Sequence, residues 1–293
     1  PFEVFVLNIS YGYGKASTND QSKTLAQVEK EFSELTEHLL SEYGDREVTF
    51  ILSNWEGDWM MRGGTSKVSR WREDGVSAVA PVRVRNMIAW IKARQEGVNL
   101  ARNEHGDSTA RVFNAVEVNK VYDGVLRGMP TITFDVLPHV EVDMVSWSAY
   151  DGKGPKYSRM EDGVVTDREG VRMYRGIDYI REQMVPTPYM NGEKVVFIGE
   201  INEHENLPGM SREWIQEFCD IVMGVYLAQK IPYIVYWELY ANEPKEGSKS
   251  QDYTRTANEL RGNWLIRPDG SHGWAQEYFD EILKLSALSS SLD

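Results

Sequence analysis

Strand-like and helix-like segments alternate along this chain, and this alternation constrains the fold more than any single motif. Short runs rich in β-branched and aromatic residues are followed by longer amphipathic segments. The pattern is typical of parallel βα units and predicts an α/β fold. We expect strands at 2–9, 47–54, 111–118, 142–149, 194–201 and 233–239, and helices at 24–43, 79–96, 168–184, 211–230 and 273–287.

Polar residues at the strand ends favour a barrel over a doubly wound sheet. A nucleotide-binding doubly wound sheet usually has a glycine-rich turn after its first strand. The turn at 10–15 has neither the dinucleotide-binding spacing nor that of a P-loop. A barrel instead assembles its active site from all of its strand ends. Polar residues near the predicted ends are Asn8, Asn54, Glu56, Glu117, Asn119, Ser148, Tyr150, Glu200, Asn202 and Glu238.

Length and charge limit the classes of protein to which the chain can belong. Its 293 residues suffice for one barrel, no linker interrupts them, and we expect a single domain over 1–293. The net charge of −13 disfavours nucleic acid and anionic membranes as partners. Neutral ligands fit this charge, and the nine Trp and fifteen Tyr offer flat rings that suit sugar faces, although most aromatic residues in any domain are core.

The sequence predicts neither a metal centre nor a cofactor. The lone Cys219 lies in a helical pattern, where a buried and unreactive thiol is expected. His204 lacks metal-ligand spacing, so we expect a solvated loop at 203–205. No apolar run is long enough to span a membrane. Because the chain begins at Pro1, we expect a processed, trimmed or truncated product that could have lost a signal peptide. The sequence does not fix the compartment, and a secreted or periplasmic location is only weakly favoured.

Two glutamates stand where a strand-like run ends. Glu56 follows the run at 48–52, and Glu200 follows the run at 195–199. Neither lies on an exposed helical face, where charge is routine. Two carboxylates delivered by different strand ends are the minimum equipment for cleaving a glycosidic bond. We therefore predict that Glu56 and Glu200 form the catalytic pair.

Several motifs resemble the clan A retaining glycoside hydrolases, which are (β/α)8 barrels of the TIM type. They are Glu56, the stretch Ser146-Trp147-Ser148-Ala149-Tyr150, Glu200 and the stretch Tyr236-Trp237-Glu238. In that clan the acid/base glutamate ends the fourth strand, a tyrosine follows the sixth, the nucleophile ends the seventh and a tryptophan lies on the eighth. The order and the spacing between strands agree, and the segment at 263–270 is similar to the end of such barrels.

The resemblance implies roles for individual residues. Glu56 is the expected acid/base and Glu200 the expected nucleophile. Apolar surroundings from Trp55 and Trp59 should favour protonated Glu56, while Tyr150 should donate a hydrogen bond to anionic Glu200. Trp237 should stack on the sugar. The predicted substrate-binding residues are Asn54, Trp59, Glu117, Asn119, Tyr150, Asn202 and Trp237.

The chain departs from the clan in two respects. The clan has an asparagine immediately before the acid/base glutamate, whereas here Trp55 separates Asn54 from Glu56. Residues two apart on a strand share a face, so both side chains could still point into the barrel mouth. The first strand found here corresponds to the clan's third. We therefore expect two further βα units, with an arginine for the nucleophile, before Pro1, or strands from another segment or subunit.

The predicted function is retaining hydrolysis of a β-linked oligo- or polysaccharide such as a glucan or mannan. The alternative is a catalytically inactive carbohydrate-binding barrel. A metal-dependent or aldol-type barrel is disfavoured, because no lysine ends a predicted strand.

Single residues also have simpler interpretations, in which Glu56 caps the following loop and Glu200 pairs with a buried arginine. Glu117 and Glu238 are rim residues or alternative acids, and Asp58 is a spare candidate.

Overall fold

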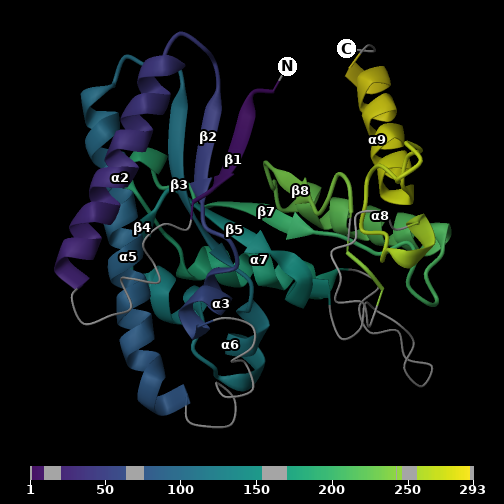
Figure 1. The fold of residues 1–293 in the computed structure, drawn as a ribbon, viewed down its shortest axis with the longest axis horizontal. Helices are drawn as coiled ribbons and strands as arrows, with labels where there is room; N and C mark the ends of the chain where they lie inside the picture. Colours follow the sequence, from purple (N-terminus) through teal and green to yellow (C-terminus); the bar gives the residue numbers. More distant parts are fainter. Residues whose placement is uncertain are drawn as a thin grey trace. The chain divides into compact units, whose positions relative to one another are not determined.

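The computed structural model describes residues 2–9, 21–63, 76–153, 170–241, 243–245 and 256–290. It shows an α/β protein in which six of the described strands form one sheet (Figure 1). Each strand lies within a range predicted from the sequence. The strands are β1 (Val4–Asn8), β2 (Thr49–Ser53), β3 (Arg111–Val118), β5 (Met144–Ser148), β7 (Val195–Ile201) and β8 (Ile234–Tyr236).

The strands of this sheet follow one another in chain order, β1-β2-β3-β5-β7-β8. The pairs β1–β2, β2–β3 and β3–β5 are parallel. A doubly wound sheet reverses its order at a switch point, so the described sheet is not one. The turn at 10–15, used above against the same fold, lies outside the described residues. An unreversed parallel order is the one that consecutive βα units of a barrel adopt.

Five helices occupy the segments predicted as helical. They are α2 (Gln21–Glu42), α5 (Val76–Glu104), α7 (Val171–Gln183), α8 (Arg212–Ala228) and α9 (Trp274–Ser290). The start of α8 is as expected: the Ser211 hydroxyl accepts the Trp214 N–H at 3.2 Å. The helix α5 continues past its predicted end because Gly97 is a packing residue. A Cβ there would lie 2.2 Å from the Glu29 carbonyl oxygen of α2, which packs beside α5.

Short elements fill segments that the sequence leaves without a clear pattern. The helix α3 (Gly57–Arg62) follows β2 in a segment for which the sequence predicts neither a helix nor a strand. Helices of one or two turns are too short for a full amphipathic period. The other short elements are α6 (Val121–Arg127), η2 (Ile132–Val136), η3 (Leu137–His139), β4 (Glu141–Val142), η4 (Ala149–Lys153), β6 (Val185–Pro186), η5 (Pro188–Met190) and η6 (Ala257–Glu259).

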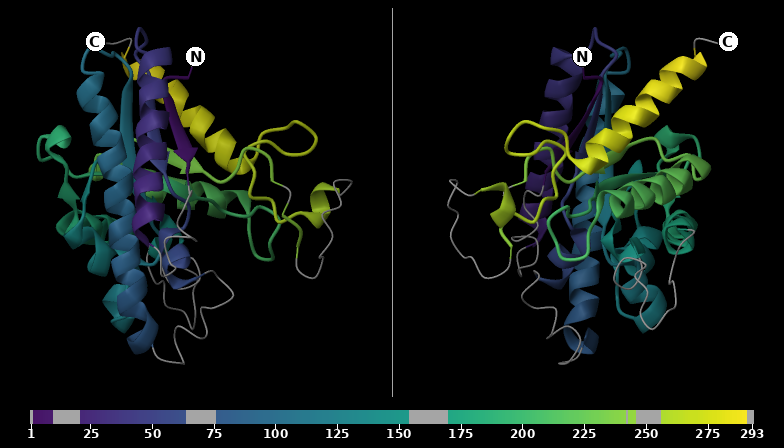
Figure 2. Two further views of the ribbon diagram at one scale, coloured as in Figure 1. Left: turned by 60° about the vertical axis from the view of Figure 1, so that its left-hand side comes forward. Right: turned by 90° about the vertical axis from the view of Figure 1, so that its right-hand side faces the viewer.

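The chain divides into two compact units, each discontinuous in sequence. Unit 1 comprises Pro1–Gly152 and Arg175–Ile198, and unit 2 comprises Lys153–Tyr174 and Gly199–Asp293. In unit 1, α2 and α5 lie along the same side of β1, β2 and β3 (Figures 1 and 2). In unit 2, α8 and α9 pack together around a buried cluster of Ile215, Cys219, Ala275 and Tyr278 (Figure 2).

Candidate functional site

The predicted site residues form two clusters, one in each unit. Glu56 lies in unit 1 between β2 and α3, and Glu200 lies in unit 2 near the end of β7. The predicted substrate-binding residues in unit 1 are Asn54, Trp59, Glu117, Asn119 and Tyr150. Those in unit 2 are Asn202 and Trp237.

Glu56 has an unusual backbone and does not cap the helix that follows it. Its φ of 46° and ψ of 58° place it in the left-handed region, and its side chain makes no capping hydrogen bond to α3. The Glu56 side chain therefore does not cap α3. Trp55 is 46% exposed, so it does not provide the buried apolar wall expected beside Glu56. One face of the half-buried Trp59 ring is covered by Lys120, whose Nζ lies 4.4 Å from the ring centroid.

Asn54 is a structural residue beneath Glu56. It is only 2% exposed, and its Oδ1 accepts hydrogen bonds from Arg94 Nη1 at 3.1 Å and from the Glu117 N–H at 3.2 Å. Arg94 is fully buried and also donates to the carbonyl oxygens of Leu52 and Ala115. Burial lowers the pKa of Arg94 to about 9. Asn54 thus joins β2 to β3. The sequence predicts that Asn54 binds substrate, but its side chain is buried and bound by these partners.

Asp58 organises the loops at the end of β3. Its side chain is fully buried, and its carboxylate accepts the N–H groups of Asn119 at 2.8 Å, Lys120 at 3.0 Å and Ile132 at 2.8 Å. The Asn119 Oδ1 in turn accepts the Asp58 N–H at 3.0 Å. A carboxylate used in this way is neither the spare catalytic acid nor accessible to substrate. Asn119, 3% exposed, is likewise a structural partner and not the substrate contact predicted for it.

We expect Asp58→Ala to lower the free energy of unfolding by about 3 to 5 kcal/mol, because three backbone N–H groups lose their acceptor. Urea unfolding followed by circular dichroism measures the change. The matched control is Asp45→Ala, whose side chain is 88% exposed and whose effect should stay within about 0.5 kcal/mol. Equal effects of the two substitutions contradict the structural role of Asp58.

Tyr150 is half-buried in η4, directly after β5. The neighbouring Asp151 fixes this turn, since its carboxylate accepts the Tyr122 N–H at 2.8 Å and the Trp147 Nε1–H at 3.1 Å. Burial raises the pKa of Asp151 to about 6, against the opposing effect of the Tyr122 N–H. The turn therefore holds Tyr150 at the strand end as the sequence predicts.

Glu200 has a buried cation in its surroundings. It is 6% exposed, and the nearby Lys153 donates to Glu203 Oε1 at 3.0 Å and to the Asn202 carbonyl oxygen. Burial lowers the pKa of Lys153, while the charges of Glu203 and Glu200 act to raise it. Sequence reasoning missed Lys153 because it lies five residues beyond Ser148, the last residue of β5, and not at the strand end.

The end of β8 carries Trp237 and a second candidate acid, Glu238, both half-buried. The Glu238 N–H donates to the Asn263 carbonyl oxygen at 2.6 Å, and the Leu265 N–H donates to the Glu238 carbonyl oxygen at 2.9 Å. Burial raises the pKa of Glu238, and the charges of Glu243 and Glu200 add to the shift. Glu238 therefore remains an alternative acid within the unit that holds Glu200.

The loop at 203–205 is buried and not solvated as expected. Glu203 pairs with Lys153, and Glu205 pairs with Arg267 at 2.9 Å, which compensates the buried charges. Burial lowers the pKa of His204 to about 4, with smaller effects from Lys153 and Arg261.

Within the described ranges, no group of three or more His, Cys, Asp or Glu side chains is arranged to hold a metal ion. The predicted burial of the Cys219 thiol is confirmed: Cys219 is 1% exposed, and burial raises its pKa to about 12.

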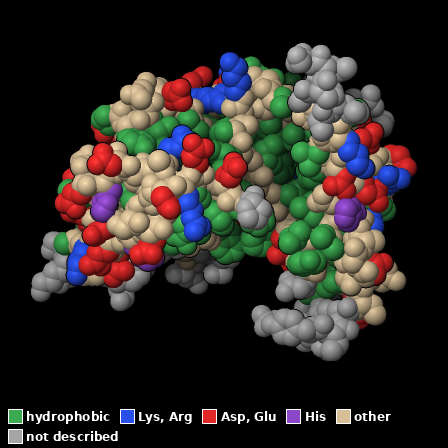
Figure 3. All heavy atoms as spheres, turned by 90° about the horizontal axis from the view of Figure 1, so that it is seen from above, with side chains coloured by type: hydrophobic (Ala, Val, Ile, Leu, Met, Phe, Trp, Pro, Cys, Tyr) green, Lys and Arg blue, Asp and Glu red, His purple; other side chains and the backbone are tan. Residues whose placement is uncertain are grey.

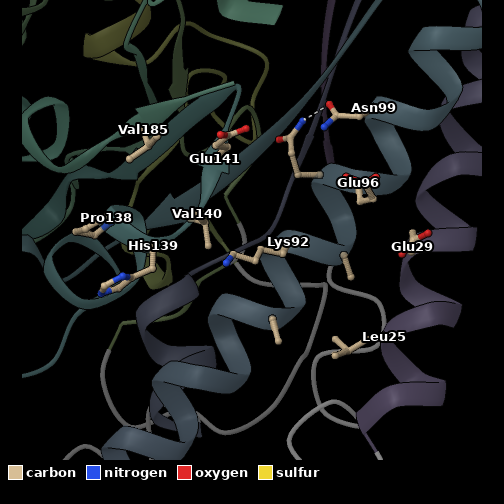
Figure 4. A pocket seen from close by; sticks show the side chains of 13 residues that line it. Leu25, Glu29, Lys92, Glu96, Asn99, Pro138, His139, Val140, Glu141 and Val185 are labelled. Atoms are coloured by element: carbon tan, nitrogen blue, oxygen red, sulfur yellow. Dashed lines mark hydrogen bonds between the residues drawn. The ribbon is translucent and has the colours of Figure 1, made fainter. Parts of the chain in front are cut away.

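A groove of about 670 Å³ lies elsewhere in unit 1, between α2, α5 and the segment that carries η3 and β4 (Figure 4). Figure 4 shows Lys92 extending from α5 toward Val140. The lining carries both signs of charge: Lys92 is basic, and Glu29, Glu96 and Glu141 are acidic. None of the predicted site residues lines this groove, so the groove is not part of the predicted site.

The surface agrees with the acidic composition. On the face shown in Figure 3, acidic side chains lie at many positions, with Lys and Arg interspersed among them. No helix in the described part of the chain is both long and apolar enough to cross a membrane.

Comparisons of the chain with protein-family models, with curated proteins and with solved structures found no match.

Proposed function

We propose that this protein is a retaining glycoside hydrolase that cleaves β-linked oligo- or polysaccharides, with Glu200 as nucleophile and Glu56 as acid/base. The main support is the position of both glutamates at the ends of β2 and β7, in a sheet whose strands follow chain order. Barrel enzymes assemble their active sites at the carboxyl ends of such strands. We further propose that the six strands belong to a (β/α)8 barrel.

The proposed reaction has two displacement steps. Glu200 attacks the anomeric carbon while Glu56 protonates the leaving oxygen; Glu56 then removes a proton from the water that hydrolyses the glycosyl ester. The buried Lys153, whose charge interacts with that of Glu200, lies near the proposed nucleophile. The exposed ring of Trp55, next to Glu56, suits stacking on a sugar. Retention requires the two carboxyl groups to come within about 5 to 5.5 Å of each other in the working enzyme.

Trapping with activated 2-deoxy-2-fluoro glycosides tests this proposal. Fluorine at C2 slows both steps, and a good leaving group restores the first, so the glycosyl ester accumulates. A panel of gluco, manno and galacto configurations also identifies the sugar class. We expect one sugar per chain, and peptide mapping should place it on Glu200. Label on another carboxylate, or no label and no hydrolysis with any sugar, overturns the proposal.

The alternative of an inactive carbohydrate-binding barrel is supported by the burial of Asn54. Asn54 is the residue that corresponds best to the asparagine of the clan, and its side-chain oxygen accepts a hydrogen bond from Arg94. Calorimetric titration with β-linked oligosaccharides separates the two functions. Binding without hydrolysis or labelling supports the alternative.

A further inference from the structure

The backbone conformation of Glu56 needs support from its surroundings, and α3 supplies only part of it, through the Met60 N–H that donates to the Glu56 carbonyl oxygen at 3.0 Å. A non-glycine residue with φ near 46° is sterically disfavoured and persists only where its surroundings impose it. As the residue that precedes α3, Glu56 makes no side-chain capping bond that could offset this cost.

Glu117 contacts this backbone directly. The Glu56 N–H donates to Glu117 Oε1 at 2.6 Å, and the Ser146 hydroxyl donates to Glu117 Oε2 at 3.0 Å. The second bond follows from the sheet register, which pairs Glu117 of β3 with Ser146 of β5. Both oxygens of the carboxylate thus accept a hydrogen bond inside the protein. Glu117 is 4% exposed, which leaves little surface for a sugar.

We infer that Glu117 is a positioning residue that holds Glu56 in its left-handed conformation and thereby sets the direction of the Glu56 carboxylate. The inference rests on the proposed function, because it takes Glu56 as the acid/base. It replaces the substrate contact that the sequence predicts for Glu117.

The chemistry of the contact explains why this position carries an acid. Both neighbours are donors, and an ionised carboxylate is an acceptor at both oxygens. Hydrogen bonds to a charged acceptor are also shorter and stronger than those to a neutral one. Glutamine can accept the Glu56 N–H with its oxygen and donate its amide N–H to the Ser146 hydroxyl, but both hydrogen bonds then lose the charge that strengthens them. Alanine removes both contacts.

Leaving-group dependence distinguishes positioning from general stability. An activated 2,4-dinitrophenyl glycoside needs little protonation, whereas a disaccharide of the same sugar needs the acid. For Glu117→Ala we expect kcat/KM to fall by about 10- to 100-fold on the disaccharide and by less than about 3-fold on the activated glycoside, and for Glu117→Gln by a few-fold on the disaccharide alone. Ser146→Ala should show the same selective pattern, a few-fold in size. Glu141→Gln, an exposed change on β4, should alter neither.

Equal losses on both substrates, or no loss on either, overturn the inference. A crystal structure of Glu117→Ala gives an independent readout: we expect the φ of Glu56 to leave the positive region, and an unchanged φ overturns the inference. If Glu117→Ala does not fold, Glu117→Gln and Ser146→Ala decide the matter kinetically. If the wild-type protein hydrolyses no glycoside and takes no fluoro-sugar label, the proposed function fails, and the torsion of Glu56 still shows whether Glu117 holds it.

Discussion

In the Glu200→Gln variant, kcat on an aryl glycoside is expected to fall by about 10⁴-fold or more, because the amide cannot form the glycosyl ester. Glutamine keeps the shape of the side chain. This matters because Glu200 is only 6% exposed and a smaller residue would leave a cavity. Steady-state kinetics measures the loss, and a thermal unfolding curve checks that the variant is folded.

Glu193→Gln is the matched control for this variant. It makes the same chemical change at an exposed position just before β7. We expect wild-type kcat there. Retained activity in Glu200→Gln excludes this residue as the nucleophile, and a comparable loss in Glu193→Gln assigns the effect to β7 as a whole.

The second prediction concerns Glu56→Ala. With an activated aryl glycoside the first step should proceed at nearly the wild-type rate, whereas kcat should fall by about 10²- to 10⁴-fold because hydrolysis of the ester lacks its base. Stopped-flow kinetics should therefore show a burst of the released phenol. Azide should restore turnover by attacking the anomeric carbon. A C–N bond then forms, the ester bond to Glu200 breaks, and the glycosyl azide keeps the configuration of the substrate.

Glu238→Ala tests the alternative acid in the same assay. Glu238 shares unit 2 with Glu200, and its raised pKa suits a proton donor. We expect this variant to show neither the burst nor rescue by azide. If both occur in Glu238→Ala and not in Glu56→Ala, the acid/base role belongs to Glu238.

The inner strands β2, β3 and β5 can be predicted from the sequence because their burial is nearly complete, whereas no residue of β1 or β8 is buried. Every residue of β2 and β5 is buried, which leaves apolar runs that stand out from the amphipathic segments. The end of α5 is not predictable locally, since Gly97 acts through its contact with α2. The division into units cannot be predicted locally either, because its three boundaries fall inside η4, α7 and β7, and none of them lies in a linker.

For the candidate site, a position at a strand end identifies candidate residues but does not predict the role of each residue. Asn54 and Glu117 occupy positions typical of active-site residues, and both are buried by partners distant in sequence. Arg94 reaches Asn54 from a helix, and Ser146 meets Glu117 only through the register of neighbouring strands. These contacts depend on tertiary packing, which no local pattern encodes. The exposure of Trp55 is unpredictable for the same reason.

The left-handed backbone of Glu56 also bears on how this protein evolves. Glycine adopts a positive φ without the steric cost that glutamate incurs, and glutamate and glycine codons differ by a single base. Mutation and selection for stability alone therefore favour glycine at position 56. In lineages that no longer use the carboxylate, we expect glycine to replace Glu56. Conservation of glutamate at this position therefore indicates selection for its chemistry.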